Sequence, residues 1–91
     1  MKLEISRTLS VSTSHITEED GEVFSESCNG QTVAYEYEYG WWVWTGEKDE
    51  NYSLLSVFTN EILALARKNN CEWVRFDADG PEIEGLETFD W

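Results

Sequence analysis

The residues best suited to chemistry in this sequence surround its only histidine. His15 follows a Ser-Thr-Ser run at residues 12–14 and lies just before a predicted helix start. A histidine base beside a hydroxyl and an orienting aspartate, such as Asp77 or Asp79, is the arrangement that a hydrolase needs. The spacing matches neither Gly-x-Ser-x-Gly nor His-Glu-x-x-His, and a lone histidine before a helix is more typical of packing or hydrogen bonding. The sequence therefore predicts no catalytic residue, and a hydrolase is a minor alternative.

Residues 77–80, Asp-Ala-Asp-Gly, carry part of the pattern of a calcium-binding loop. The third acidic position is missing, and Thr88 stands where such a loop has its ligating glutamate. Cys28 and Cys71 lack metal-binding spacing, and two cysteines are too few for a disulfide framework. We therefore predict two small buried or half-buried thiols, no metal and no cofactor, with a metal-binding domain as part of the same minor alternative.

Three segments alternate apolar and polar residues as β-strands do, and these strands would position the residues described above. Residues 3–12 and 72–77 place apolar and polar side chains in turn. Residues 31–45 combine Val, Tyr and Trp at the same period, and Gly40 is the expected turn or bulge between two strands there.

Two further segments predict helices. Thr17 is the expected N-cap of the first helix and forms a capping box with Asp20. The second helix, over residues 53–69, repeats apolar residues at helical spacing and has its cap at Asn51 or Ser53.

Together these elements predict one compact domain, residues 1–91, with the order β-α-β-β-α-β. That order is typical of an α+β two-layer sandwich, in which a small, mainly antiparallel sheet carries two helices on one face. The apolar residues Ile83, Leu86 and Phe89 indicate that the C-terminal tail packs back on this body.

The most distinctive feature of the chain is its acidity. It has 19 Asp and Glu against 6 Lys and Arg, a formal net charge of −13 over 91 residues, and also five Trp, four Tyr and four Phe. Disordered acidic segments are poor in aromatic residues, so this composition indicates that the charges lie on a folded frame. Anionic proteins are repelled by nucleic acid and anionic membranes and attracted to basic surfaces. We therefore expect no direct binding to nucleic acid or membrane.

The chain also lacks a run of about 20 apolar residues and an apolar signal segment, which predicts a cytoplasmic protein.

The acidic residues predict a surface that binds a basic partner, because small domains usually need a net charge of only about 2–8 for solubility. Glu36 and Glu38 would project from one strand face about 6.6–6.8 Å apart. This spacing is on the scale of the phosphate charges of DNA, about 3.4 Å apart on each strand. The predicted surface comprises Glu18, Glu19, Asp20, Glu22, Glu26, Glu36, Glu38, Glu47, Asp49 and Glu50, with Trp42 and Trp44 as possible aromatic hot spots.

Several short stretches of the chain carry a resemblance to known sequences. They are Ser12-Thr13-Ser14-His15-Ile16-Thr17, Tyr39-Gly40-Trp41, Arg75-Phe76-Asp77-Ala78-Asp79-Gly80 and residues 85–91. They resemble a small domain family of unknown function found in bacteria and their phages and plasmids. The family has no established activity to transfer, although the shared His15 and Asp77/Asp79 could mark a site. Compact acidic proteins of mobile elements are similar in character to anti-restriction and anti-CRISPR inhibitors, several of which imitate DNA.

The leading hypothesis is therefore a monomeric inhibitor encoded by a phage or mobile element. It would imitate DNA on the basic DNA-binding surface of a host defence complex, with a CRISPR effector favoured. The alternative is a small acidic protein-interaction module without DNA mimicry, whose charge only maintains solubility.

Overall fold

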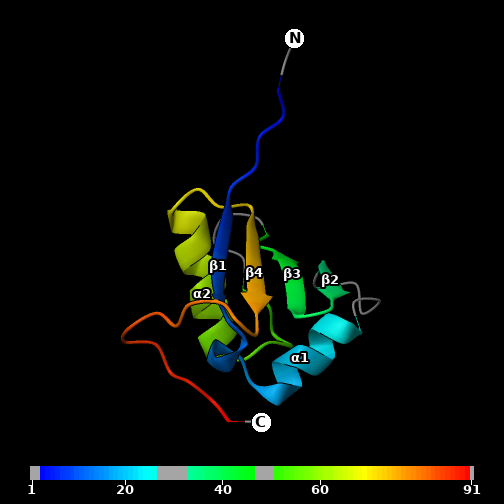
Figure 1. Ribbon diagram of the computed structural model, residues 1–91, viewed down its shortest axis with the longest axis vertical. Helices are drawn as coiled ribbons and strands as arrows, with labels where there is room; N and C mark the ends of the chain where they lie inside the picture. Colours follow the sequence, from blue (N-terminus) through cyan, green and yellow to red (C-terminus); the bar gives the residue numbers. More distant parts are fainter. Residues whose placement is uncertain (1–2, 27–32, 47–50, 91) are drawn as a thin grey trace.

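The computed structural model describes residues 3–26, 33–46 and 51–90 (Figure 1). It confirms the predicted α+β domain and its element order, and it adds one short 3₁₀ helix after the first strand. In chain order the elements are β1 (Thr8–Ser12), the 3₁₀ helix η1 (Thr13–His15), α1 (Glu18–Ser25), β2 (Ala34–Tyr37), β3 (Gly40–Trp44), α2 (Val57–Lys68) and β4 (Trp73–Asp77).

The four strands form one sheet in the order β1-β4-β3-β2 (Figure 1). The β2–β3 and β3–β4 pairs are antiparallel, whereas β1 pairs with β4 in parallel, with Thr8 opposite Trp73 and Ser12 opposite Asp77. The sheet is thus mainly antiparallel, as predicted. Two residues, Glu38 and Tyr39, form the turn between β2 and β3, and Gly40 is the first residue of β3 rather than part of the turn.

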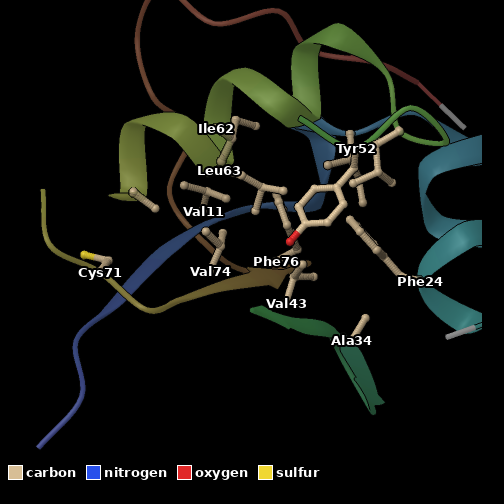
Figure 2. Packing of buried hydrophobic residues seen from close by; sticks show 13 residues of the cluster. Val11, Phe24, Ala34, Val43, Tyr52, Ile62, Leu63, Cys71, Val74 and Phe76 are labelled. Carbon is tan, nitrogen blue, oxygen red and sulfur yellow. The ribbon is translucent and has the colours of Figure 1, made fainter. Parts of the chain in front are cut away.

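The sheet has one covered face and one open face. Alternation along the strands places Val11, Val43, Val74 and Phe76 on the covered face, where all four are fully buried. Both helices pack there, because Phe24 of α1 and the apolar residues of α2 belong to the same core cluster. Figure 2 shows the labelled side chains of α2 directed toward those of the sheet. The two-layer arrangement with both helices on one face is therefore confirmed.

The predicted start of the first strand is wrong. Leu3 and Ile5 are 70% and 78% exposed, and β1 begins only at Thr8. Among the described strands, β1 lies at the edge of the sheet and pairs with β4, which begins at Trp73, so the residues before Thr8 have no described strand beside them. Arg7 still contacts the start of β4, since its carbonyl accepts a 3.0 Å hydrogen bond from the Glu72 N–H and its N–H donates to the Glu72 carboxylate at 2.7 Å, whereas the chain before it extends away from the body (Figure 1).

The two helices differ in how well their starts were predicted. Thr17 caps α1 in a capping box with Asp20, as expected from the sequence. The start of α2 is not at Asn51 or Ser53 but at Val57, with Ser56 as the N-cap. The preceding residues form a turn instead, since the side chain of Asn60 accepts a hydrogen bond from the Tyr52 N–H and donates one to the Tyr52 carbonyl.

The C-terminal tail after β4 has no regular structure but packs back on the body, as predicted. Ile83 and Leu86 lie against the core cluster. The ring of Phe89 lies 5.0 Å from that of Phe58 on α2, and the Phe89 N–H donates a 2.7 Å hydrogen bond to the carbonyl of Ser14.

Candidate protein-binding surfaces

The exposed side of α1 carries a row of carboxylates. Glu18, Glu22 and Glu26 follow one another at four-residue spacing, so they lie along one side of the helix and its C-cap, and Glu19 is also exposed. Glu18 and Glu19 are favoured by the positive end of the helix dipole. Like charges four residues apart destabilise an isolated helix by about 0.2–0.5 kcal/mol per pair. The row is therefore partly unfavourable for the helix itself.

The β2–β3 hairpin continues this acidic surface. The Ser25 hydroxyl at the end of α1 donates to Glu36 Oε1 at 3.1 Å and accepts a 3.2 Å hydrogen bond from the indole N–H of Trp41. These contacts place Glu36 beside the last turn of α1. Glu38 lies in the turn after β2, so the predicted row of Glu36 and Glu38 on one strand face is wrong. We call Glu18, Glu19, Glu22, Glu26, Glu36 and Glu38 the acidic surface.

Asp20 does not belong to the acidic surface, contrary to the prediction, because it is buried and only 1% exposed. Its carboxylate accepts hydrogen bonds from the Ser56 N–H at 2.7 Å, the hydroxyls of Ser56 and Thr59 at 2.6 Å each, and the Thr17 N–H at 3.2 Å. Asp20 thus joins the N-termini of both helices, and we call these four residues the helix junction.

The environment of the helix junction favours the charged form of Asp20. Burial alone raises the pKa of this carboxyl, but the hydrogen bonds from the Ser56 and Thr59 side chains and from the backbone of Ser56 and Thr17 outweigh burial and lower the pKa below its usual value. The sequence signal for this role was the spacing of Asp20 from Thr17. Its contact with Ser56 could not be foreseen.

The remaining predicted acidic residues, Glu47, Asp49 and Glu50, lie outside the described residues, as does Cys28. Cys71 is a buried free thiol.

The described basic residues lie mostly at the other end of the sheet. Arg7 precedes β1, and Arg67 and Lys68 lie in the last turn of α2, whereas α1 and the β2–β3 turn lie where β1 and β4 end (Figure 1). Within the part of the chain that the structure describes, no lysine or arginine forms an ion pair with the acidic surface. The carboxylates there are therefore not neutralised by described neighbours.

The aromatic residues next to the acidic surface are not those predicted. Trp42 and Trp44 project from the open face of the sheet, whereas Trp41 lies on the covered side, opposite Glu36. Trp41 also borders a depression of about 250 Å³ together with Glu36, Glu38 and Tyr39. Locating the turn at residues 38–39 would have revealed this pairing.

The open face of the sheet is largely aromatic. The register places Tyr35, Trp42, Trp44 and Trp73 on it, and the rings of Tyr35 and Trp73 approach to 6.1 Å at an angle of 41°. The Arg75 guanidinium lies 5.7 Å from the ring centre of Trp42. This face therefore combines a broad apolar area with one cation.

Asp77 is the one carboxylate that the described strands place on the open face. It accepts a short hydrogen bond from the hydroxyl of Tyr37 and a 2.7 Å bond from the Asp79 N–H. Burial raises the pKa of Tyr37 to about 12, with help from the hydrogen bond to Asp77 and its negative charge. The hydrogen bond from Tyr37, followed by that from Asp79, in turn lowers the pKa of Asp77.

His15 holds the C-terminal tail. It is 1% exposed, its Nδ1 lies 2.8 Å from the Glu87 carbonyl, and its Nε2 accepts a 2.8 Å hydrogen bond from the Ile83 N–H. This pattern requires a neutral ring with its proton on Nδ1. Both ring nitrogens are therefore engaged with the backbone, and the carboxylate of Asp77 is bonded to Tyr37 and to the Asp79 N–H instead.

Among the residues that the structure describes, no three His, Cys, Asp or Glu side chains converge as a metal site would require. No helix in this part of the chain is long and apolar enough to cross a bilayer.

Comparison with known proteins places the chain in a family but assigns it no activity. Neither a curated protein nor a solved structure shows significant similarity to it. A family model described as the C-terminal domain of a family of unknown function, DUF5983, matches residues 8–91. The match begins at the first residue of β1 and includes every described helix and strand. The chain therefore belongs to the DUF5983 family.

Proposed function

We propose that this domain is an inhibitor that binds the basic, nucleic-acid-binding surface of another protein through its acidic surface. The observation that carries the proposal is the set of exposed carboxylates on α1 and the hairpin, which have no ion-pair partner among the described residues. Because the row on α1 is unfavourable for the helix alone, a cationic partner would compensate for it.

The mechanism would be electrostatic imitation of a polynucleotide. Rigid carboxylates on α1 and the adjoining hairpin would occupy the Lys and Arg positions that otherwise contact phosphates. Such binding is steered by charge and weakens as salt rises. The domain and duplex DNA would then compete for the same site.

The proposed partner is a DNA-binding complex of bacterial defence, and a CRISPR effector is the first one to test. The likeness in character between compact acidic proteins of mobile elements and known DNA-mimicking inhibitors supports this choice. The domain would act without catalysis and as a monomer.

The proposal is tested by competition between the domain and labelled duplex DNA for a purified CRISPR effector. The triple variant Glu18→Gln, Glu22→Gln, Glu26→Gln removes three charges from the acidic surface. Since an exposed ion pair contributes about 0.2–1 kcal/mol, we expect its inhibitory potency to fall about tenfold. The matched control Glu4→Gln, Glu61→Gln, Glu84→Gln removes three exposed charges elsewhere and should stay within about twofold of the wild type.

Two results would contradict the proposal. Equal losses in both triple variants would show that only net charge matters. Simultaneous binding of the domain and DNA to the effector would show that the carboxylates do not occupy the DNA site.

The second candidate function is a protein-interaction module without DNA mimicry. The depression bordered by Trp41, Tyr39, Glu36 and Glu38 favours it, because carboxylates beside aromatic rings suit a single Lys or Arg side chain of a partner. The test is capture of a partner from a bacterial lysate. A partner protein that does not bind nucleic acid, and that no longer binds when Trp41 is replaced by leucine, would support this alternative.

A further inference from the structure

His15 is the central attachment of the C-terminal tail, the orange and red segment in Figure 1. Its ring lies between two backbone groups of the tail, with Nδ1 2.8 Å from the Glu87 carbonyl and Nε2 2.8 Å from the Ile83 N–H. The ring is buried, so water does not compete for these two contacts while the tail is in place. Ile83 and Leu86 of the tail lie against the core cluster. His15 therefore holds the part of the tail that packs on the body.

Backbone hydrogen bonds attach the two ends of the tail. The Pro81 carbonyl accepts a 2.9 Å bond from the Ser12 N–H, and the Phe89 N–H donates a 2.7 Å bond to the Ser14 carbonyl. The Phe89 ring also packs against α2. Because residues 81–90 form no helix or strand, the position of the tail depends on these contacts and on His15.

The two bonds of His15 need a neutral ring. A neutral imidazole has one donor and one acceptor nitrogen, which match the Glu87 carbonyl and the Ile83 N–H. A protonated ring has two donors and no acceptor. Its Nε2–H would face the Ile83 N–H, and a positive charge would be buried, both of which are unfavourable. Protonation therefore favours a state in which the tail has left the ring.

The ionisable groups on the segments around His15 are mainly carboxylates. Those of the tail are exposed, and they are Glu82, Glu84, Glu87 and Asp90. In the first turn of α1, near Phe58 on α2 and at the end of β4, the carboxylates are Glu18, Glu19, Asp20, Glu61, Asp77 and Asp79. Asp20 is engaged in the helix junction, Asp77 accepts from Tyr37, and Glu82 accepts a 2.8 Å bond from the Ser14 hydroxyl.

No positive charge on these segments opposes proton uptake by the ring. Residues 8–26 and 76–90 contain neither lysine nor arginine. The two cations of α2, Arg67 and Lys68, lie in its last turn, whereas the tail contacts its first turn. The surrounding negative charge therefore favours an imidazolium once the ring has reached water.

We propose that the C-terminal tail is an acid-released strap, which detaches when His15 takes up a proton. At neutral pH the uncharged ring holds the tail on the body. As pH falls, one proton from the solvent binds Nε2, and the Ile83 N–H loses its acceptor. Release uncovers Phe58 on α2 and the apolar surface under Ile83 and Leu86. The strap is independent of the proposed inhibitory function, because it needs neither the acidic surface nor a basic partner.

Proton linkage sets the expected size of the effect. With the tail released, the exposed ring gains a proton where an ordinary histidine does, near pH 6.5. The attached state has no acceptor to spare for that proton. The ratio of released to attached tails should therefore rise by up to about tenfold for each unit of pH below about 6.5, or about 30-fold between about pH 7.5 and 5.

The test is NMR spectroscopy of the whole domain between about pH 7.5 and 5. His15 is the only histidine of the chain, so its ring nitrogen signals report proton uptake without ambiguity. Hydrogen exchange of the Ile83 and Phe89 amides, corrected for the intrinsic effect of pH, reports attachment of the tail. We expect their protection to fall about 30-fold as the ring is protonated. The amides of Val43 and Val74 in the sheet should stay protected.

Two variants assign the release to His15. His15→Gln cannot take up a proton in this range, so the protection of its tail amides should not change with pH. If this variant fails to fold, the ring signals of the wild type still decide the question. Glu82→Gln is the matched control, because it removes the carboxylate that is bonded to Ser14 and keeps His15. Its tail should detach over the same pH range as that of the wild type.

Four outcomes would overturn the proposal. A ring that stays neutral down to pH 5 would show that the strap is not released by acid. A ring that is protonated while Ile83 and Phe89 stay protected would show that the tail tolerates the charge. Loss of protection in the sheet together with the tail would show unfolding of the whole domain. A tail that no longer responds to pH in Glu82→Gln would assign the effect to that carboxylate.

Discussion

The helix junction and the open face of the sheet differ in whether their polar groups have hydrogen-bond partners. At the junction, the carboxylate of Asp20 accepts four hydrogen bonds and is hidden from solvent. On the open face, Trp42 and Trp73 leave their N–H groups without a partner in the described part of the chain. A satisfied and buried polar group stabilises a fold, whereas an accessible and unsatisfied one is available to a ligand. The comparison therefore separates the residues that hold this domain together from those that can recognise something else.

The largest expected effect comes from removing the centre of the junction. Asp20→Ala leaves several buried donors unpaired at both helix starts, and we expect the free energy of unfolding to fall by about 3 kcal/mol. Tyr35→Ser, on the open face, should change it by no more than about 0.5 kcal/mol. Urea unfolding followed by tryptophan fluorescence measures both. Similar losses of unfolding free energy in the two variants would contradict the distinction between the stabilising junction and the open face.

A smaller effect is expected when pH alone removes the charge of Asp20, because the side chain and its neighbours stay in place. The pKa of this group is lowered in the folded state, so its contribution is present above the pKa of the unfolded chain, about 3.9, and is lost as pH falls through the folded pKa. In Asp20→Asn this contribution is absent at every pH. Unfolding experiments between neutral pH and acid should therefore show the wild type and the variant converging as pH falls. A constant difference between them would contradict the role given to the charge.

The smallest effect is expected at the edge of the open face, where Tyr37 donates to Asp77. The pKa of Tyr37 is raised to about 12 in the folded state, so the small stabilisation is present below the usual tyrosine pKa of about 10 and is lost as pH rises through about 12. Ultraviolet titration should show one late-ionising tyrosine, which Tyr37→Phe removes and Asp77→Asn shifts toward pH 10. If all tyrosines of Asp77→Asn and the wild type ionise alike, the hydrogen bond does not control Tyr37.

Local patterns were sufficient to predict much of the fold. The capping box of Thr17 and Asp20 involves residues three positions apart, and the helical spacing in α2 is equally local. The strand alternation around Val74 and Phe76 likewise identified a covered face. These features depend on neighbours in the sequence, which is why they could be inferred without coordinates.

The errors arose where distant residues meet. Asp20 looked like one more surface acid, because its partner Ser56 lies on the other helix. The first strand was predicted too long because its length depends on where β4 begins. The faces of Trp41 and Trp42 depended on the position of one turn, since a shift by one residue exchanges the two faces of a strand. The candidate sites were accordingly less predictable than the fold.

During synthesis, β1 leaves the ribosome long before β4, the strand with which it pairs, has been made. The β2–β3 hairpin can close early, but the nascent chain must keep β1 unpaired until Trp73–Asp77 have emerged. Contacts between segments so far apart in sequence slow folding, so this small domain should reach its native state more slowly than a helical bundle of the same length. Its abundant negative charge would help to keep such an incomplete chain from aggregating while it waits.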